Sequence, residues 1–169
     1  MTNERHQILT DKQVQQKLNR IAYQILESNY TEKELILVGI KPRGFTIAKK
    51  LSTLLKGMSE ITITLCSMKI NKSDPSAEEI KLDPSMPDVK DKVVILIDDV
   101  TDSGKTLTYA IKPFLNNLQK KIQSVVLVDR QHKRYPIAPD FVGLSLATTM
   151  QESISVELGK PGKEGAYIS

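Results

Sequence analysis

Apolar residues along the chain occur either in short continuous runs or at helical spacing. Residues 93–97 form the strongest run, five consecutive branched apolar side chains, which indicates a strand buried on both faces of a parallel sheet. Residues 35–40 and 124–129 have the same character, and residues 61–65 alternate at period two, as in a strand with one wetter face. Because these strands alternate with helical patterns, we expect an α/β fold with a mostly parallel central sheet flanked by helices.

Two segments in the first third of the chain have apolar residues at helical spacing. The first begins after Thr10, which forms a capping-box pattern with Gln13, and ends before Asn29. We expect this helix to serve packing. The second covers residues 45–56, and Gly57 is expected to follow it as the C′ residue.

A third helix is expected to open directly after Gly104. Its apolar positions recur at helical spacing: Leu107, Ala110, Ile111, Phe114 and Leu118. Pro113 lies inside this pattern and lacks a backbone N–H donor, so we expect it to kink or restart the helix.

Other segments lack a clear helical period. Residues 68–92 are long, polar and hold three prolines, which is typical of a functional covering loop or an insert, and part of this segment is expected to form a hairpin. Residues 141–146 and 154–158 are expected to supply edge strands. In the tail, residues 159–169, composition predicts a flexible segment at residues 159–165, and a final short strand is expected at residues 166–169.

Composition indicates a soluble protein with one domain. The chain has 169 residues, of which 40% are apolar and 26% charged. Its net charge of +4 suits an anionic substrate or RNA but arises from scattered lysines. A single cysteine, Cys66, excludes an internal disulfide and is expected to be a packed thiol. Two distant histidines make no metal cluster, and no stretch has the length of a membrane span, so we expect a cytoplasmic protein.

The chemistry concentrates at the end of the strand at residues 93–97. Asp98 and Asp99 follow it, and their oxygens are acceptors suited to ribose hydroxyls or to a divalent cation. Next comes a turn of small and hydroxyl residues that opens a helix, where backbone N–H groups can bind a phosphate: Thr101, Asp102, Ser103, Gly104, Lys105 and Thr106. From this stretch alone, the alternative interpretation is that the two acids only cap the helix that follows.

A second anion site is predicted where the strand at residues 35–40 ends. Lys41, Arg43 and Gly44 form a cationic turn that leads into a helix, which suits a further phosphate group. The Gly-Lys-Thr triplet does not make the turn at residues 101–106 a triphosphate-binding loop. That loop needs a glycine five residues before the Gly-Lys pair, and Asp99 stands there.

Taken together, these motifs resemble the signature for phosphoribosyl pyrophosphate in type I phosphoribosyltransferases. Residues 37–44, residues 127–130 with His132, and residues 136–143 resemble one branch, the bifunctional pyrimidine-operon attenuation regulators and uracil phosphoribosyltransferases. The similarity runs from about residue 8 to 158. It implies a type I phosphoribosyltransferase fold, a mobile hood over the site at residues 68–92, Mg²⁺ with phosphoribosyl pyrophosphate as co-substrate, a nucleobase as acceptor and a homo-oligomer.

The resemblance also implies roles for residues. Asp98 and Asp99 would hold the ribose hydroxyls, with Mg²⁺ bound mainly through substrate oxygens, and the turn at residues 101–106 would hold the 5′-phosphate. The pyrophosphate would lie at the cationic turn, where Arg43 is a catalytic candidate and where relatives often hold a cis peptide, here expected at Ile40–Lys41. Three further candidates would lie on the base or pyrophosphate side: Asp129, Arg130 and His132.

Several positions depart from the family pattern. Relatives carry a Tyr-Arg pair where this chain has Cys66-Ser67, and Lys69 or Lys72 could replace only the charge of the arginine. Asp102 matches an aspartate that 6-oxopurine phosphoribosyltransferases carry near the purine ring. Against purines, Asp129 stands where those enzymes use a lysine. We therefore expect uracil as the base, with a 6-oxopurine enzyme as the alternative.

An RNA-binding regulator is a second class of hypothesis, and a non-catalytic nucleotide sensor is a third. Positions that the regulators use for RNA are here Asn19, Tyr23, Ala138 and Leu144. The last two replace basic residues, which should weaken RNA affinity and its salt dependence. Lys133 retains a charge at another such position. We therefore expect the RNA-regulator function to be lost.

Overall fold

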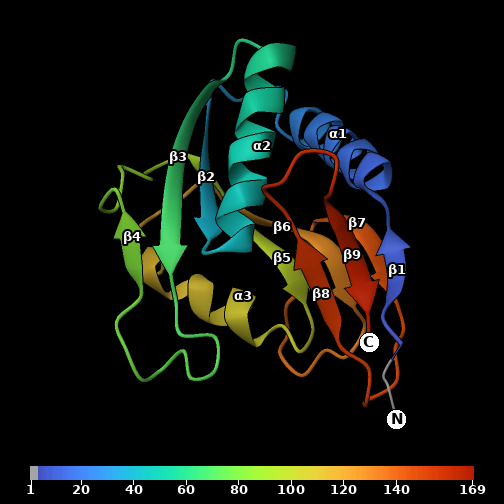
Figure 1. Cartoon of the computed structure of the whole chain (residues 1–169). Coiled ribbons are helices and arrows are strands. Elements are labelled where there is room, and N and C mark those ends of the chain that lie inside the picture. The colour runs from blue at the N-terminus through green and yellow to red at the C-terminus, as the bar shows by residue number, and fades with distance from the viewer. Residues whose placement is uncertain (1–3) are drawn as a thin grey trace.

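A six-stranded sheet runs through the centre of the computed structural model, which describes residues 4–169 (Figure 1). The strand order is β4-β3-β2-β5-β6-β7. Five strands pair in parallel: β2 (Glu34–Ile40), β3 (Thr62–Lys69), β5 (Val93–Thr101), β6 (Lys121–Arg130) and β7 (Phe141–Leu146). At one edge, β4 (Lys81–Asp83) pairs antiparallel with β3. The expected mostly parallel sheet is confirmed.

Helices cover both faces of this sheet, which explains the continuous apolar runs of its strands. Helices α1 (Asp11–Ser28) and α2 (Arg43–Met58) pack on one face, in a cluster that includes Leu37 and Ile95. On the other face, α3 (Lys105–Ala110) and the 3-10 turn η1 (Lys112–Phe114) pack on alternate residues of the same strands, such as Val38. No helix within residues 4–169 is long and apolar enough to cross a membrane.

The first two helices differ in how well the sequence predicted their ends. In α1 the capping box is present, because Thr10 Oγ1 accepts from Gln13 N at 3.3 Å and Gln13 Oε1 accepts from Thr10 N at 2.9 Å. Helix α2 is longer than predicted at both ends. Gly57 lies inside it, so its assignment as the C′ residue was wrong: the residue after the helix is Ser59, in extended conformation.

The third helix is shorter than its apolar pattern predicted. Helix α3 ends at Ala110, and the chain restarts as η1 around Pro113, as expected from the missing N–H of proline. Leu118 was wrongly assigned to this helix. Its side chain is 79% exposed, and its carbonyl accepts a hydrogen bond from Asp91 N at 2.9 Å.

A second, small antiparallel sheet has the order β1-β9-β8. Its strands are β1 (His6–Leu9), β8 (Ile154–Glu157) and β9 (Gly165–Ile168). The predicted final strand is therefore confirmed, whereas β1 was not predicted. The strand expected at residues 154–158 belongs to this sheet and is not an edge of the main one. Before β9, Glu164 is buried and its carboxylate pairs with Lys50 Nζ at 2.9 Å.

The segment beside β3 contains a hairpin, as expected. Strand β3 extends to Lys69, so it includes the first two residues of the expected hood, residues 68 and 69, and it pairs with β4. We define residues 70–92 as the hood segment. Cys66 is buried in β3, and burial raises the pKa of its thiol. The cis peptide expected at Ile40–Lys41 was wrong by one residue, because the cis bond joins Lys41 and Pro42.

The topology changes direction between the carboxyl ends of β2 and β5. These strands are neighbours, but β2 continues through α2 on one face and β5 continues through α3 on the other. The connections after these two strands therefore run to opposite faces of the sheet. Ligands bind at such a point in open α/β sheets. Both predicted anion-binding turns follow these two strands.

Gly44 allows the first turn of α2 to approach β5 closely. A Cβ at this position would lie 2.5 Å from the carbonyl oxygen of Ile97 and 2.9 Å from Asp98 Cα. A side chain here would push the helix away from the strand that carries the acids. Gly57 near the other end of α2 has no atom within 4 Å of such a Cβ.

We expect Gly44→Ala to lower the free energy of unfolding by about 1–3 kcal/mol or more, because overpacking displaces α2. Gly57→Ala is the matched control in the same helix and should raise it by about 0.5 kcal/mol, since alanine restricts the unfolded chain. Urea unfolding of both variants measures the difference. Equal stability of the two variants would contradict the close-approach argument.

Candidate active site

Two carboxylates lie side by side near the end of β5 and are almost inaccessible to solvent. Asp98 is 1% exposed and Asp99 is 3% exposed. The strand continues through both residues to Thr101, so the pair is fixed by the sheet rather than by a loop. Asp98 Oδ1 also accepts a hydrogen bond from the Asp99 backbone N–H at 2.9 Å.

Two cations from other elements neutralise this acid pair. Arg43, the first residue of α2, places Nε 2.7 Å from Asp99 Oδ2. Lys72 of the hood segment places Nζ 2.9 Å from Asp98 Oδ1 and 3.6 Å from Asp99 Oδ1. Of the two hood lysines considered from the sequence, the structure thus brings Lys72 to the acids. Lys69 ends β3 and is exposed.

The two carboxyl groups have different proton affinities. Burial raises the pKa of Asp98 to about 7, and the neighbouring charge of Asp99 adds to the rise, while Lys72 opposes it. Burial alone would also raise the pKa of Asp99, but hydrogen bonds from Asp98 and Arg43 and the charge of Lys72 lower it overall. Of the two, Asp98 is therefore the carboxyl that holds its proton up to higher pH, whereas Asp99 ionises more readily than an ordinary aspartate.

The turn after β5 encloses a small polar cavity next to the acids. The cavity has a volume of about 160 Å³ and is lined by Thr101, Asp102, Ser103, Gly104, Lys105 and Thr106, together with Lys72, Asp98 and Val100. Gly104 has φ +84°, a left-handed conformation that glycine adopts without strain. The Ser103 carbonyl accepts from Arg134 N at 2.9 Å and from Tyr135 N at 3.0 Å, which fixes the turn.

The cationic turn follows β2, the strand that pairs with β5. Lys41 is exposed, and its backbone N–H donates to the Met68 carbonyl at 2.9 Å. Pro42 precedes the first residue of α2, so Arg43 and Gly44 belong to the helix. The first of these two points at Asp99, and the second allows the close approach to β5.

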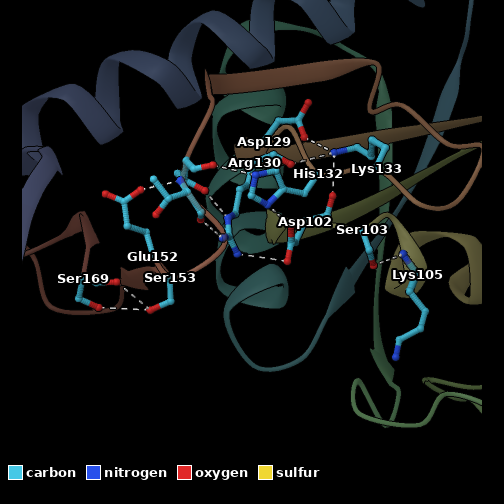
Figure 2. A network of polar contacts seen from close by, with 12 residues as sticks. Asp102, Ser103, Lys105, Asp129, Arg130, His132, Lys133, Glu152, Ser153 and Ser169 are labelled. Carbon is cyan, nitrogen blue, oxygen red and sulfur yellow. Dashed lines mark hydrogen bonds and ion pairs between the residues drawn. The ribbon is translucent and has the colours of Figure 1, made fainter. Parts of the chain in front are cut away.

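Asp102 is the centre of a polar network beside the cavity (Figure 2). Its carboxylate lies 3.3 Å from Arg130 Nη1 and 3.6 Å from His132 Nδ1. Both partners are also held by the segment before β8, since Arg130 Nη2 donates to the Thr149 carbonyl at 2.7 Å and His132 Nε2 lies 2.8 Å from the Thr148 carbonyl. The structure thus brings Asp102 next to Arg130, 28 positions further along the sequence, and next to the neighbouring candidate His132.

Asp129 has a different partner. The ammonium of Lys133 contacts its carboxylate and lies 3.2 Å from the Asp102 carbonyl and 3.3 Å from the Arg130 carbonyl. These three acceptors match the three donors of an ammonium group. Sequence analysis did not assign these roles to Lys133 or Thr148. A spacing of four residues predicts a contact only on a helix, and Asp129 to Lys133 is the end of β6 and a loop, so no local pattern marked Lys133 or Thr148.

The acid pair fits a metal ion only in part. Among residues 4–169, no group of three or more His, Cys, Asp or Glu side chains is arranged to hold a metal. Two carboxylates suit Mg²⁺ that takes most of its ligands from a bound substrate and from water. The donor set therefore fits an ion that arrives with a polyphosphate.

Comparison with curated proteins gives relatives of similar length. The chain is 38% identical over 163 residues to the bifunctional protein PyrR of Clostridium acetobutylicum, covering 92% of each chain. It is 34% identical over 172 residues to the bifunctional protein PyrR of Ligilactobacillus salivarius, covering 96% of this chain and 97% of the relative.

Solved structures share the fold at lower identity. A hypoxanthine-guanine phosphoribosyltransferase from Bacillus anthracis superposes with a TM-score of 0.70 at 22% identity, over 83% of this chain and 81% of the other. The hypoxanthine phosphoribosyltransferase of Trypanosoma cruzi gives a TM-score of 0.72 at 17% identity, over the same shares of the two chains.

The family assignment rests on the sequence matches together with the fold. The model of the phosphoribosyl transferase domain matches residues 4–158, which include both predicted anion-binding turns, the acid pair and the Asp102 network. This chain therefore belongs to the phosphoribosyltransferase family, with an α/β fold of the type I class.

Proposed function

We propose that this enzyme transfers the phosphoribosyl group of phosphoribosyl pyrophosphate to uracil and releases pyrophosphate. The observation that supports it most directly is the pair of buried carboxylates, fixed by β5 directly before a phosphate-sized polar cavity. Carboxylate oxygens accept hydrogen bonds from the two ribose hydroxyls, while the turn at residues 101–106 binds the 5′-phosphate.

The reaction exchanges one bond at the ribose C1 for another. A ring nitrogen of the base forms a bond to C1 as the bond from C1 to the pyrophosphate oxygen breaks, and that oxygen keeps the bonding electrons. The base loses its ring N–H proton, which the departing pyrophosphate oxygen or water takes up. Lys41 and Arg43, which follow β2, stabilise the negative charge that develops on pyrophosphate. Mg²⁺ would be held mainly by substrate oxygens, with Asp98 and Asp99 as candidate protein ligands, and would supply further neutralisation.

Uracil is the preferred base in this proposal because Asp129 occupies the position of the purine enzymes' lysine. Lys133 does not replace that lysine as a donor to the base, since its three donors have acceptors within the protein. The second candidate is a 6-oxopurine. The observation in its favour is Asp102, whose carboxylate is 47% exposed beside the cavity and can accept a base N–H.

In this proposal the protein is a homo-oligomer in the cytoplasm. It has no RNA-regulator function. Asn19 and Tyr23 are exposed on α1, but Ala138 and Leu144 offer no charge to a phosphate backbone. Without those cations, binding to a pyrimidine-operon leader RNA should be weak and little affected by salt. The oligomer and the compartment follow from the family resemblance and from the single buried cysteine.

The base can be identified by pyrophosphate release. With Mg²⁺ and phosphoribosyl pyrophosphate, we expect release with uracil and none with hypoxanthine, guanine or xanthine, because Asp129 removes the purine-side lysine. Release with a purine alone would contradict the uracil assignment and make Asp102 the specificity residue. If no pyrophosphate is released with any of the four bases, the result would contradict the enzymatic function and favour a non-catalytic nucleotide sensor.

Loss of either buried acid should reduce turnover. Asp98→Asn and Asp99→Asn each remove a charge-assisted hydrogen bond to ribose worth about 1.5–3 kcal/mol, so we expect kcat/KM to fall about 10- to 150-fold. Asp88→Asn is the control, an exposed acid of the hood segment whose side chain is 78% exposed. In steady-state kinetics, kcat/KM of Asp88→Asn should equal that of the wild type. A full rate for Asp98→Asn would show that this carboxylate does not hold the substrate.

The buried acid pair should also make stability depend on pH. The folded-state pKa of Asp98, about 7, lies above the ordinary value of about 3.9, so its contribution to stability is present below about pH 4 and is lost as pH rises through about 7. The loss amounts to at most about 4 kcal/mol. Asp98→Asn removes it. Urea unfolding from pH 4 to pH 8 should show the variant gaining stability relative to the wild type as pH rises, and parallel curves would contradict the raised pKa.

A further inference from the structure

Lys72 reaches the acid pair from outside the sheet. It lies 26 positions before Asp98 in the sequence, and its ammonium is the cation closest to that carboxylate, with Nζ 2.9 Å from Oδ1. Its side chain is 38% exposed, whereas that of Asp98 is 2% exposed. The contact therefore joins a solvent-facing hood segment to a buried catalytic group.

The hood segment around Lys72 is a compact loop that presents this side chain inward. Asn71 Oδ1 accepts hydrogen bonds from Ser73 N and Asp74 N, each at 3.1 Å. The Ser73 carbonyl in turn accepts from Lys105 Nζ at 3.3 Å, which ties the loop to the phosphate-binding turn. Lys72 also lines the cavity formed by that turn.

Lys72 and a ribose compete for the same oxygens. In the proposed function, the hydroxyls donate to Asp98 and Asp99, and Lys72 Nζ stands at 2.9 Å and 3.6 Å from one oxygen of each. Arg43 donates to the other oxygen of Asp99, at 2.7 Å, so it can remain in place when a ribose binds. Lys72 is therefore the exchangeable cation of the two.

We propose that Lys72 is an internal counter-ion that occupies the ribose position in the ligand-free enzyme and leaves when a ribose phosphate binds. This inference rests on the proposed function for the identity of the ligand. Its consequence is that occupation of the site and the position of the hood segment are coupled. Before a ribose binds, the ion pair of Lys72 with the acids holds the hood segment in place. When the ribose hydroxyls donate to the carboxylates instead, this contact of the hood is lost.

The first test needs no ligand. In hydrogen exchange of the free protein, Lys72→Met should make the amides of residues 71–77 exchange about fivefold faster or more, because the hood loses its attachment to Asp98. Lys81→Met is the matched control, an exposed lysine of the same segment in β4. Unchanged exchange in Lys72→Met would show that the contact does not hold the hood, and would overturn the proposal.

The second test measures competition directly with ribose 5-phosphate, which carries the hydroxyls and the 5′-phosphate but neither base nor pyrophosphate. If Lys72 occupies the ribose position about 90% of the time, its removal should tighten binding about tenfold in calorimetry. Lys72→Arg keeps the charge and should bind as the wild type does, as should Lys81→Met.

The outcomes separate this inference from the proposed function. Tighter binding by Lys72→Met than by Lys81→Met supports the competition. Equal or weaker binding by Lys72→Met, with a wild type that binds ribose 5-phosphate, overturns the counter-ion role and leaves the proposed function standing. A wild type that fails to bind ribose 5-phosphate overturns the proposed ribose site, and the inference with it.

Discussion

Two neighbouring carboxylates buried at the end of one strand are costly unless cations and donors reach them, and the surrounding structure meets this requirement. Arg43 arrives from the start of α2, which Gly44 allows to lie against β5. Lys72 arrives from the hood segment, and the raised pKa of Asp98 lowers the charge of the pair below neutral pH. The positions of α2 and of the hood are thus both tied to the electrostatics of Asp98 and Asp99.

Local patterns in the sequence predicted the scaffold well where burial imposes a simple period. Strands β2, β5 and β6 are covered on both faces, so their continuous apolar runs stand out, and the capping box at Thr10 marks the start of α1. The third helix was predicted too long because Leu118 continues the apolar spacing, although Pro113 has already ended the regular helix. Strand β1 was missed because its four residues, mostly exposed, carry no such period.

The candidate site was predictable from the sequence at residues 98–106 and less so around Asp102. Residues 98–106 are contiguous, so strand, acids and turn appear together in the sequence. By contrast, the contact from Lys72 to Asp98 and the contacts from Thr148 and Thr149 to the Asp102 network depend on how distant segments fold together. No local pattern encodes them.

The Asp102 network connects elements that belong to different sheets. Arg130 ends β6 of the main sheet, while Thr149 lies in the connection that leads to β8 of the small sheet. The groups proposed to bind ribose and phosphate lie on β5 and the turn after it. The groups proposed to lie beside the base are held by hydrogen bonds to Thr148 and Thr149, here called the bracing segment. Substitutions in the bracing segment can therefore alter which base is accepted while the grip on the shared co-substrate is preserved. In the proposed function, this separation would give one scaffold a physical route by which its preferred nucleobase changes during evolution.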